Sequence, residues 1–220
     1  MIRALAIIAL LASAAHAKPC AGGPMFARAI LGAKPRVSGS GGLIVVGDKL
    51  PDWRFRALDK LVRPDVRVLA PGLAIYHPLP QPGDEVVLET TDQNQVARAQ
   101  RVFSIEPPIG PPAVARISSE SNGTYTYVTA ALSAAAPATA RIVIVSRVVG
   151  KRTVPIAWRF ASSGAGVLTL WQSPGGCSET ISGWVQPEVG ERVVLAWVDD
   201  AGRVSEPSKP IVISEGSKRK

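Results

Sequence analysis

The sequence predicts an all-β protein built from two tandem β-sandwiches. Gly190–Asp199 contains a Val-Val-Leu run between a glycine and an aspartate, and Gly83–Asp92 repeats this pattern 107 residues earlier. Trp53–Phe55 (Trp-Arg-Phe) recurs as Trp158–Phe160 at an offset of 105 residues. Two matches at nearly one period indicate an internal duplication. Short apolar runs separated by Gly and Pro turns, without sustained helical periodicity, indicate strands.

The duplication divides the chain into two modules. We assign residues 18–106 to the first sandwich, 113–214 to the second and 215–220 to a basic tail. Residues 107–112 contain four prolines and form the linker. Because proline-rich linkers are extended and semi-rigid, we expect this one to hold the modules apart.

The first module contains short expected strands with turn residues between them. They are Met25–Leu31 (an edge strand), Leu43–Val46 (buried), Val66–Leu69, Leu73–Tyr76, Glu85–Thr90 and Ala99–Ile105. Pro71-Gly72 is the expected turn between two of them. Ala57–Val62 is a candidate for a brief helix, which Pro64 would end.

The second module contains seven expected strands. They are Val114–Ile117, Tyr125–Thr129, Arg141–Val145, Ile156–Phe160, Val167–Trp171, Arg192–Val198 and Lys209–Ser214. Arg192–Val198 is apolar on both faces, which predicts a central strand. Alternation predicts that Ile156, Trp158 and Phe160 share one face. We expect Ala130–Ala140 to be a loop with a short turn, because it contains Pro137 and several hydroxyl residues.

The end of the second module carries a resemblance to a known fold. Seven short strands in about a hundred residues are typical of an immunoglobulin-like sandwich. Asp199–Ser208, followed by Pro210–Ile213, resembles the end of a fibronectin type III domain, in which a strand, a glycine turn and a Ser-x-Pro-Ser segment lead into the last strand. The resemblance covers the second module better than the first. It implies two Ig-like or fibronectin type III-like sandwiches with binding, spacing or structural roles in exported proteins.

Residues 1–17 have the features of a secretory signal peptide. Arg3 precedes the apolar run Ala4–Ala12, and small residues at Ala15 and Ala17 predict cleavage after Ala17. Lys18-Pro19 before Cys20 argues against lipidation. No later stretch is long and apolar enough to span a bilayer. We therefore expect an exported protein, periplasmic or extracellular, with no transmembrane segment after cleavage.

The charge balance of the mature chain is positive. Without Arg3, 24 basic residues face 17 acidic ones, which gives a net charge of +7. This balance favours an anionic partner, such as an envelope protein or an anionic glycan, with solubility alone as the alternative. The basic residues are scattered and form no cluster interleaved with exposed aromatic residues, so no specific nucleic-acid partner is expected.

Cys20 and Cys177 are the only cysteines. In an oxidising compartment their simplest use is an intramolecular disulfide, which would close a loop of 157 residues and restrain the two modules. Free or intermolecular thiols are the alternative.

Candidate catalytic and metal-binding residues are few. His77 is the only histidine after cleavage, and no Gly-x-Ser-x-Gly elbow accompanies it, so we interpret it as a loop histidine. Asp199, Asp200 and Glu206 offer oxygen ligands for calcium, but adjacent acids in a turn are typical of a solvated hairpin tip. We expect no catalytic residues, no cofactor and no metal site.

Four tryptophans follow each other at intervals of thirteen residues: Trp158, Trp171, Trp184 and Trp197. Trp158 and Trp197 are predicted to pack in the core. Trp171 and Trp184 either pack in the core or stack exposed rings on sugars. We therefore expect a non-enzymatic exported binding or structural protein. The alternatives are a carbohydrate-binding module that uses Trp171 and Trp184, and a hydrolase or enzyme accessory domain.

Overall fold

A computed structural model describes the strands and most of the second half of the chain. The described residues are 28–30, 36–38, 42–50, 54–57, 60–77, 85–89, 96–102, 109–122, 125–162, 164–173 and 183–216. Every helix or strand in these ranges is a β-strand, which confirms the all-β prediction. None of these ranges holds a helix that could cross a membrane. The predicted signal peptide, Cys20 and Cys177 lie outside the described residues.

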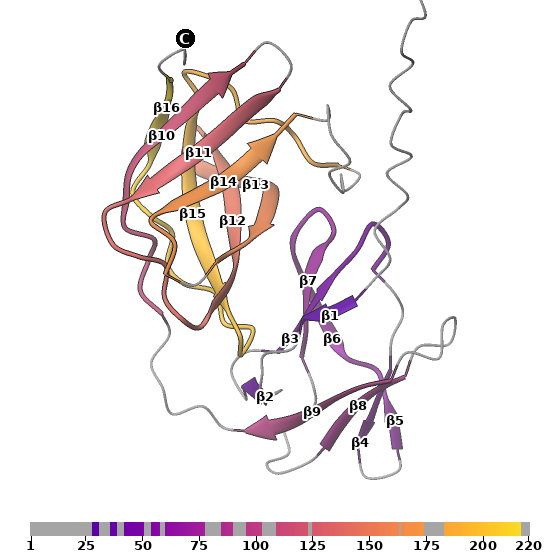
Figure 1. Ribbon diagram of the computed structural model, residues 1–220. Helices are drawn as coiled ribbons and strands as arrows, with labels where there is room; N and C mark the ends of the chain where they lie inside the picture. The colour runs from indigo at the N-terminus through magenta and orange to yellow at the C-terminus, as the bar shows by residue number, and fades with distance from the viewer. Residues whose placement is uncertain are drawn as a thin grey trace, which may run out of the picture.

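The first half of the chain forms two sheets (Figure 1). The four-stranded sheet has the order β1 (Arg28–Ile30), β3 (Leu43–Val46), β7 (Leu73–His77), β6 (Asp65–Ala70). The five-stranded sheet has the order β2 (Arg36–Ser38), β9 (Val96–Val102), β8 (Glu85–Glu89), β4 (Arg54–Ala57), β5 (Lys60–Val62). β2 and β9 are parallel and the other pairs are antiparallel.

The second half forms one seven-stranded sheet that curls on itself. Its order is β13 (Arg152–Phe160), β12 (Ala140–Val149), β15 (Arg192–Asp199), β16 (Ile211–Glu215), β10 (Val114–Ser121), β11 (Thr126–Leu132), β14 (Val167–Gln172). The two edge strands approach each other, because Nε of Arg159 in β13 donates to the carbonyl oxygen of Leu170 in β14 at 3.3 Å. The sheet encloses a core that includes Val143, Leu195 and Trp197. The sheet is therefore nearly closed around its own apolar interior.

Several expected elements are confirmed. β1 is an edge strand, β3 is buried throughout, and β6 and β7 flank Pro71-Gly72. β15 lies between β12 and β16, as its apolar character on both faces predicted. The loop expected at Ala130–Ala140 is shorter than predicted: residues 133–139 form the turn, because Ala130–Leu132 belong to β11 and Ala140 begins β12.

The brief helix expected at Ala57–Val62 is wrong. β4 ends at Ala57, and β5 begins at Lys60 and pairs with it antiparallel. Phe55 lies opposite Val62 in this hairpin. Backbone pairing of the two strands takes the place of a single helical turn that would have no caps.

The expectation that Ile156, Trp158 and Phe160 share one face is wrong for Ile156. β12 and β13 pair with a register shift that leaves Ile156 as an extra residue between Pro155 and Ala157. Ile156 therefore turns into the core of the second half, beside Ala157. Trp158 points to the opposite side, where its ring meets Phe160 edge-on at 5.3 Å. A β-bulge re-aims side chains in this way because it breaks the period of two.

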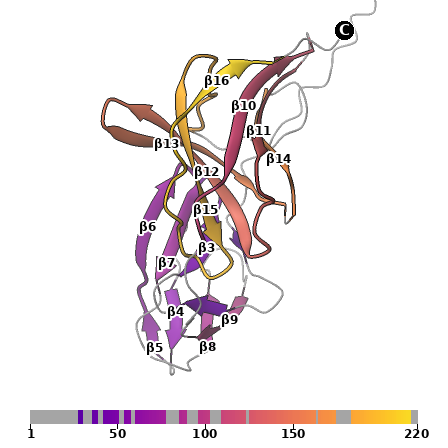
Figure 2. The same ribbon diagram turned by 90° about the vertical axis from the view of Figure 1, so that its left-hand side faces the viewer.

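The side of the sheet to which Trp158 points is covered by the first half of the chain. Ile142, Ile144, Trp158 and Val198 form one buried cluster with residues of the four-stranded sheet: Ile44, Val46, Ala70, Leu73 and Ile75. β3 and β7 thus pack on β12, β13 and β15 (Figures 1 and 2). The two halves are in contact, contrary to the expectation that the linker holds them apart. Both present apolar side chains, and removing these side chains from water is favourable.

The two sequence repeats are not placed alike in the sheets. Val86–Leu88 lies in β8 and Val193–Leu195 in β15, and each of these strands has a neighbour on both sides. Phe55 lies in β4, which pairs directly with β8. Phe160 lies in β13, which is separated from β15 by β12. The two copies of Trp-Arg-Phe therefore do not occupy corresponding strands.

Two glycines lie where the halves approach most closely. The backbone N–H of Gly42 donates to the carbonyl oxygen of Ala201 at 3.1 Å. Gly202 has φ of 72°, and a Cβ at this position would overlap the carbonyl oxygen of Gly42. Only glycine fits there, for its conformation and for the space available.

We predict that Gly202→Ala destabilises the protein more than Gly190→Ala. Gly190 also has a positive φ, of 88°, but a Cβ there meets nothing within 4 Å. Gly190→Ala should cost only the left-handed conformation, about 1–2 kcal/mol. Gly202→Ala should cost a further ~1–3 kcal/mol, because the two backbones must separate. Urea denaturation measures both, and equal losses would contradict the close approach.

Candidate functional site

A cleft opens beside the interface between the two halves. Its volume is about 350 Å³. Arg67, Ile75 and His77 line it from β6 and β7, and residues 202–206 line it from the second half. Ile75 and Val204 also contact the buried cluster of the interface. Ligand sites often lie between packed units, where an apolar floor meets a few polar groups.

Asp199 shapes the turn that carries residues 202–206. Its fully buried carboxylate accepts hydrogen bonds from the backbone N–H groups of Ala201, at 3.0 Å, and Arg203, at 2.8 Å. The Arg203 guanidinium donates to the same carboxylate through Nε and Nη2, both at 2.7 Å. Four donors thus hold one side chain, so the turn has a single defined geometry.

The Ser-x-Pro-Ser segment is attached to β15 by its two serines. The Ser205 Oγ accepts from the Trp197 N–H at 2.9 Å, and the Ser208 Oγ accepts from the Leu195 N–H at 3.0 Å. The backbone N–H of Ser205 donates to the carbonyl oxygen of Trp197 at 3.0 Å, and that of Ser208 donates to the carbonyl oxygen of Leu195 at 2.7 Å. These bonds fix the backbone on both sides of Glu206, which is exposed at the cleft.

The cleft brings opposite charges together without pairing them. Arg67 lies opposite Ile75 in the β6–β7 register, and His77 lies opposite Asp65. Arg67 and Glu206 both line the cleft but form no ion pair with each other, and no described residue forms one with Arg67. Arg203, by contrast, is already neutralised by Asp199. Among the described residues, nothing pairs with the Arg67 guanidinium or the Glu206 carboxylate, so a ligand can meet both charges in the same cleft.

His77 and Ser205 both line the cleft, but Ser205 is committed to the backbone. Its hydroxyl donates to the carbonyl oxygen of Glu206 at 2.8 Å. An activated serine instead gives its proton to an adjacent base. This geometry suits the binding of a ligand better than nucleophilic attack. His77 itself is the last residue of β7 and not a loop residue.

Two tryptophans bind the carbonyl oxygen of Pro71 in the β6–β7 turn. The Nε1 of Trp158 donates to it at 3.0 Å and that of Trp184 at 3.2 Å. Their rings meet edge-on, with 5.3 Å between centroids. The same turn that joins β6 to β7 is thus held by both residues, next to the apolar interface.

The side chain of Arg159 lies over the rings of Trp184 and Trp171. Its guanidinium lies 4.5 Å from the centroid of Trp184 and 5.9 Å from that of Trp171. Burial lowers the pKa of Arg159 from its ordinary value, because the charged form loses hydration. The ring faces of both tryptophans stabilise the cation in place of water.

The two residues proposed for sugar stacking lie close together, with ring centroids 6.4 Å apart. Trp171 is only 7% exposed and belongs to the core of the second half, whereas Trp184 is half-buried and contacts both clusters. These contacts, with Arg159 over both rings, favour packing over stacking on a ligand. Trp158 and Trp197 are buried, as predicted, but in different clusters.

The acidic turn differs from the expected solvated hairpin tip. Asp199 is buried and paired with Arg203, and Asp200 pairs with Arg141 at 3.5 Å. Within the described parts of the chain, no group of three His, Cys, Asp or Glu side chains is placed to hold a metal ion. The carboxylate of Asp199 stabilises the turn, because its oxygens already accept four hydrogen bonds.

Sequence reasoning missed Arg67 and Arg203. Arg67 lies in an unremarkable alternating strand, so only the packing of the halves identifies it. Arg203 carried a usable signal: Asp199 and Arg203 are four residues apart around a glycine, a spacing that lets an aspartate accept bonds within its own turn. No protein-family model and no curated protein matches the chain.

We predict that Trp184→Phe destabilises the protein more than Trp171→Phe. Trp184→Phe removes the hydrogen bond to Pro71 and should cost about 1 kcal/mol for that bond alone. Trp171 is the matched control, because its buried Nε1 has no hydrogen-bond partner among the described residues. The two free energies of unfolding in urea give the comparison. A larger loss for Trp171→Phe would contradict the role given to the Trp184 bond.

Proposed function

We propose that this protein is an exported, non-enzymatic binding protein of the cell envelope or extracellular space. Its two halves are Ig-like sandwiches, and it binds an anionic ligand in the cleft between β6, β7 and residues 202–206. The observation that carries the proposal is Arg67, which no described residue pairs, in a cleft whose other side is fixed by Asp199 and the two serines.

Strand order supports the Ig-like assignment. In Ig domains, strands lettered A to G in chain order form the sheets ABED and CFG. With β2 and β5 as additional strands beside A and C, the first half has the sheets A-B-E-D and A′-G-F-C-C′. In the second half, β14, β11 and β10 follow the order E-B-A, while β13, β12, β15 and β16 follow C′-C-F-G. β16 and β10 join the two groups through a parallel pair.

The chemistry of the cleft favours a sugar acid as the ligand. A uronic acid carries a carboxylate, which complements the guanidinium of Arg67, and hydroxyl groups, which can donate to Glu206. Ile75 and Val204 offer an apolar floor to the ring. An anionic glycan thus satisfies both charges of the cleft, and its repeating units suit a small, open site.

We predict that Arg67→Ala weakens the binding of oligogalacturonate at least ~10-fold, the effect of losing one charged hydrogen bond. Isothermal titration of the purified protein gives the affinity. Arg116→Ala is the control, because Arg116 is an exposed arginine of β10 outside the cleft. Equal losses in both variants would indicate non-specific attraction, and tighter binding of poly-glutamate than of the sugar acid would contradict a glycan ligand.

We also predict that the exported protein begins at Lys18 and contains a Cys20–Cys177 disulfide. Intact-mass spectrometry of protein recovered from the producing cells tests both statements. The mass should correspond to residues 18–220 and should increase by about two hydrogens on reduction, as expected for one bond in an oxidising compartment. A mass that includes residues 1–17 would contradict export by signal cleavage.

A further inference from the structure

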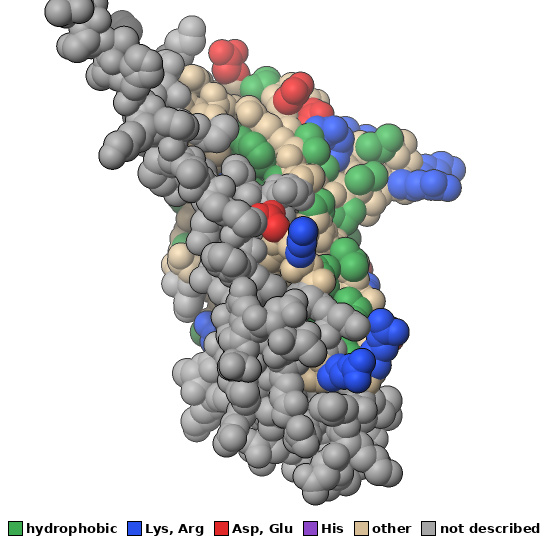
Figure 3. Space-filling view, turned by 90° about the vertical axis from the view of Figure 1, so that its right-hand side faces the viewer, with side chains coloured by type: hydrophobic (Ala, Val, Ile, Leu, Met, Phe, Trp, Pro, Cys, Tyr) green, Lys and Arg blue, Asp and Glu red, His purple; other side chains and the backbone are tan. Residues whose placement is uncertain are grey.

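The hairpin formed by β12 and β13 projects beyond the sheet to which it belongs. β15 pairs with β12 only as far as Arg147, opposite Val193, whereas β12 and β13 continue to pair as far as Val149, opposite Arg152. Gly150, with φ of 61°, and Lys151 close the loop. Residues 148–150 lie beyond the last β12 residue that pairs with β15, and three residues correspond to about 10 Å of extended chain. Figures 2 and 3 show the hairpin as an arm that stands away from the body.

The arm combines exposed apolar and basic side chains. Val149 is 55% and Val154 47% exposed. In the antiparallel register they share one face with Arg147 and Arg152. Lys151 at the tip is also exposed, and Figure 3 shows Lys or Arg side chains at the end of the arm and hydrophobic ones along it.

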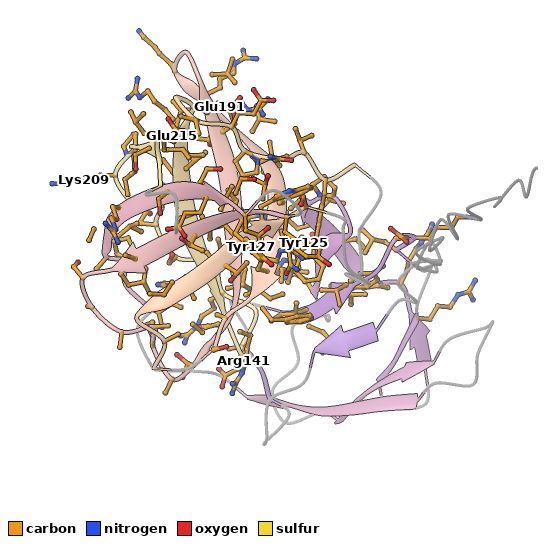
Figure 4. The ribbon with its side chains drawn as sticks, turned by 45° about the horizontal axis from the view of Figure 1, so that its top comes forward. Tyr125, Tyr127, Arg141, Glu191, Lys209 and Glu215 are labelled. Atoms are coloured by element: carbon orange, nitrogen blue, oxygen red, sulfur yellow. The ribbon has the colours of Figure 1, made fainter. Side chains whose placement is uncertain are left out.

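The charges at the tip differ from those at the base. Arg147 at the base is paired with Glu191 at 3.0 Å. Lys151 and Arg152 form no ion pair with any described residue. Figure 4 places Glu191 near the end of the sandwich from which the arm projects and Arg141 at the opposite end. Within the arm, the unpaired positive charge therefore lies at its outer part.

We propose that the β12–β13 hairpin docks on an anionic lipid surface. Anionic headgroups complement Lys151 and Arg152, and the half-exposed valines enter the boundary between headgroups and acyl chains, which an interfacial element reaches to about 5–10 Å. A planar bilayer can be reached by a convex, projecting tip. An acidic protein surface would satisfy the two cations but would leave Val149 and Val154 in contact with polar groups. This role is separate from the cleft and does not depend on it.

Co-sedimentation with vesicles tests the proposal. The mature protein should bind vesicles of phosphatidylcholine and phosphatidylglycerol, bind pure phosphatidylcholine vesicles far more weakly, and be released by high salt. The double variant Lys151→Glu, Arg152→Glu should lower the partition coefficient by at least ~30-fold, since each basic residue near such a surface contributes roughly five-fold. Arg116→Glu with Lys209→Glu is the matched control, because it changes the net charge equally at two exposed sites elsewhere.

A second pair of variants distinguishes insertion of the valines into the bilayer from electrostatic attraction alone. Val149→Ser with Val154→Ser keeps the charge and should weaken binding about five-fold by removing apolar contact. Val167→Ser with Val212→Ser is its control, because these valines are exposed to 61% and 55% on other strands. Unchanged thermal midpoints establish that the variants are folded. No binding by the native protein, binding equal on both vesicle types, or equal losses in the test and control variants would overturn the proposal.

Discussion

The structure depends on one sheet that is apolar on both faces. In β12, Val143 and Val145 face the core of the second half, while Ile142 and Ile144 face the other way. A sandwich can bury only one face of such a sheet, so the other must be covered by another part of the chain. The four-stranded sheet of the first half covers it. The two halves are therefore held by a shared apolar cluster.

The cleft lies at the edge of this interface, where the apolar cluster gives way to contacts between backbone segments. Beyond the apolar cluster, the halves approach through backbone, where Gly42 meets Ala201 and Gly202. The turn at this point needs a defined shape, and the buried Asp199–Arg203 pair provides it. Breaking such a pair by removing one partner commonly costs about 3–5 kcal/mol, because a buried charge is left alone. The proposed ligand site therefore depends on the same turn that contacts Gly42 of the first half.

β12 and β13 have two different parts along their length. Their inner parts lie between the two apolar clusters, whereas the residues near Gly150 extend past every neighbouring strand. Val143 and Val145 on the inner part are buried, whereas Val149 and Val154 on the outer part are exposed. The sequence marks this boundary at Ser146 and Arg147, just after the end of the predicted strand Arg141–Val145, although β12 itself continues to Val149. The proposed membrane contact and the interface are thus built from one pair of strands.

The sequence by itself determined the all-β class, the places of most strands and the Gly and Pro turns between them. These features are local: alternation, apolar runs and turn chemistry act over a few residues. Tertiary structure decided where side chains point when local periodicity breaks, as at the Ile156 bulge, which sends Trp158 to the interface. It also decided which apolar face is covered and that Arg67 lies near Glu206, because contacts between segments over a hundred residues apart leave no periodic trace in either segment.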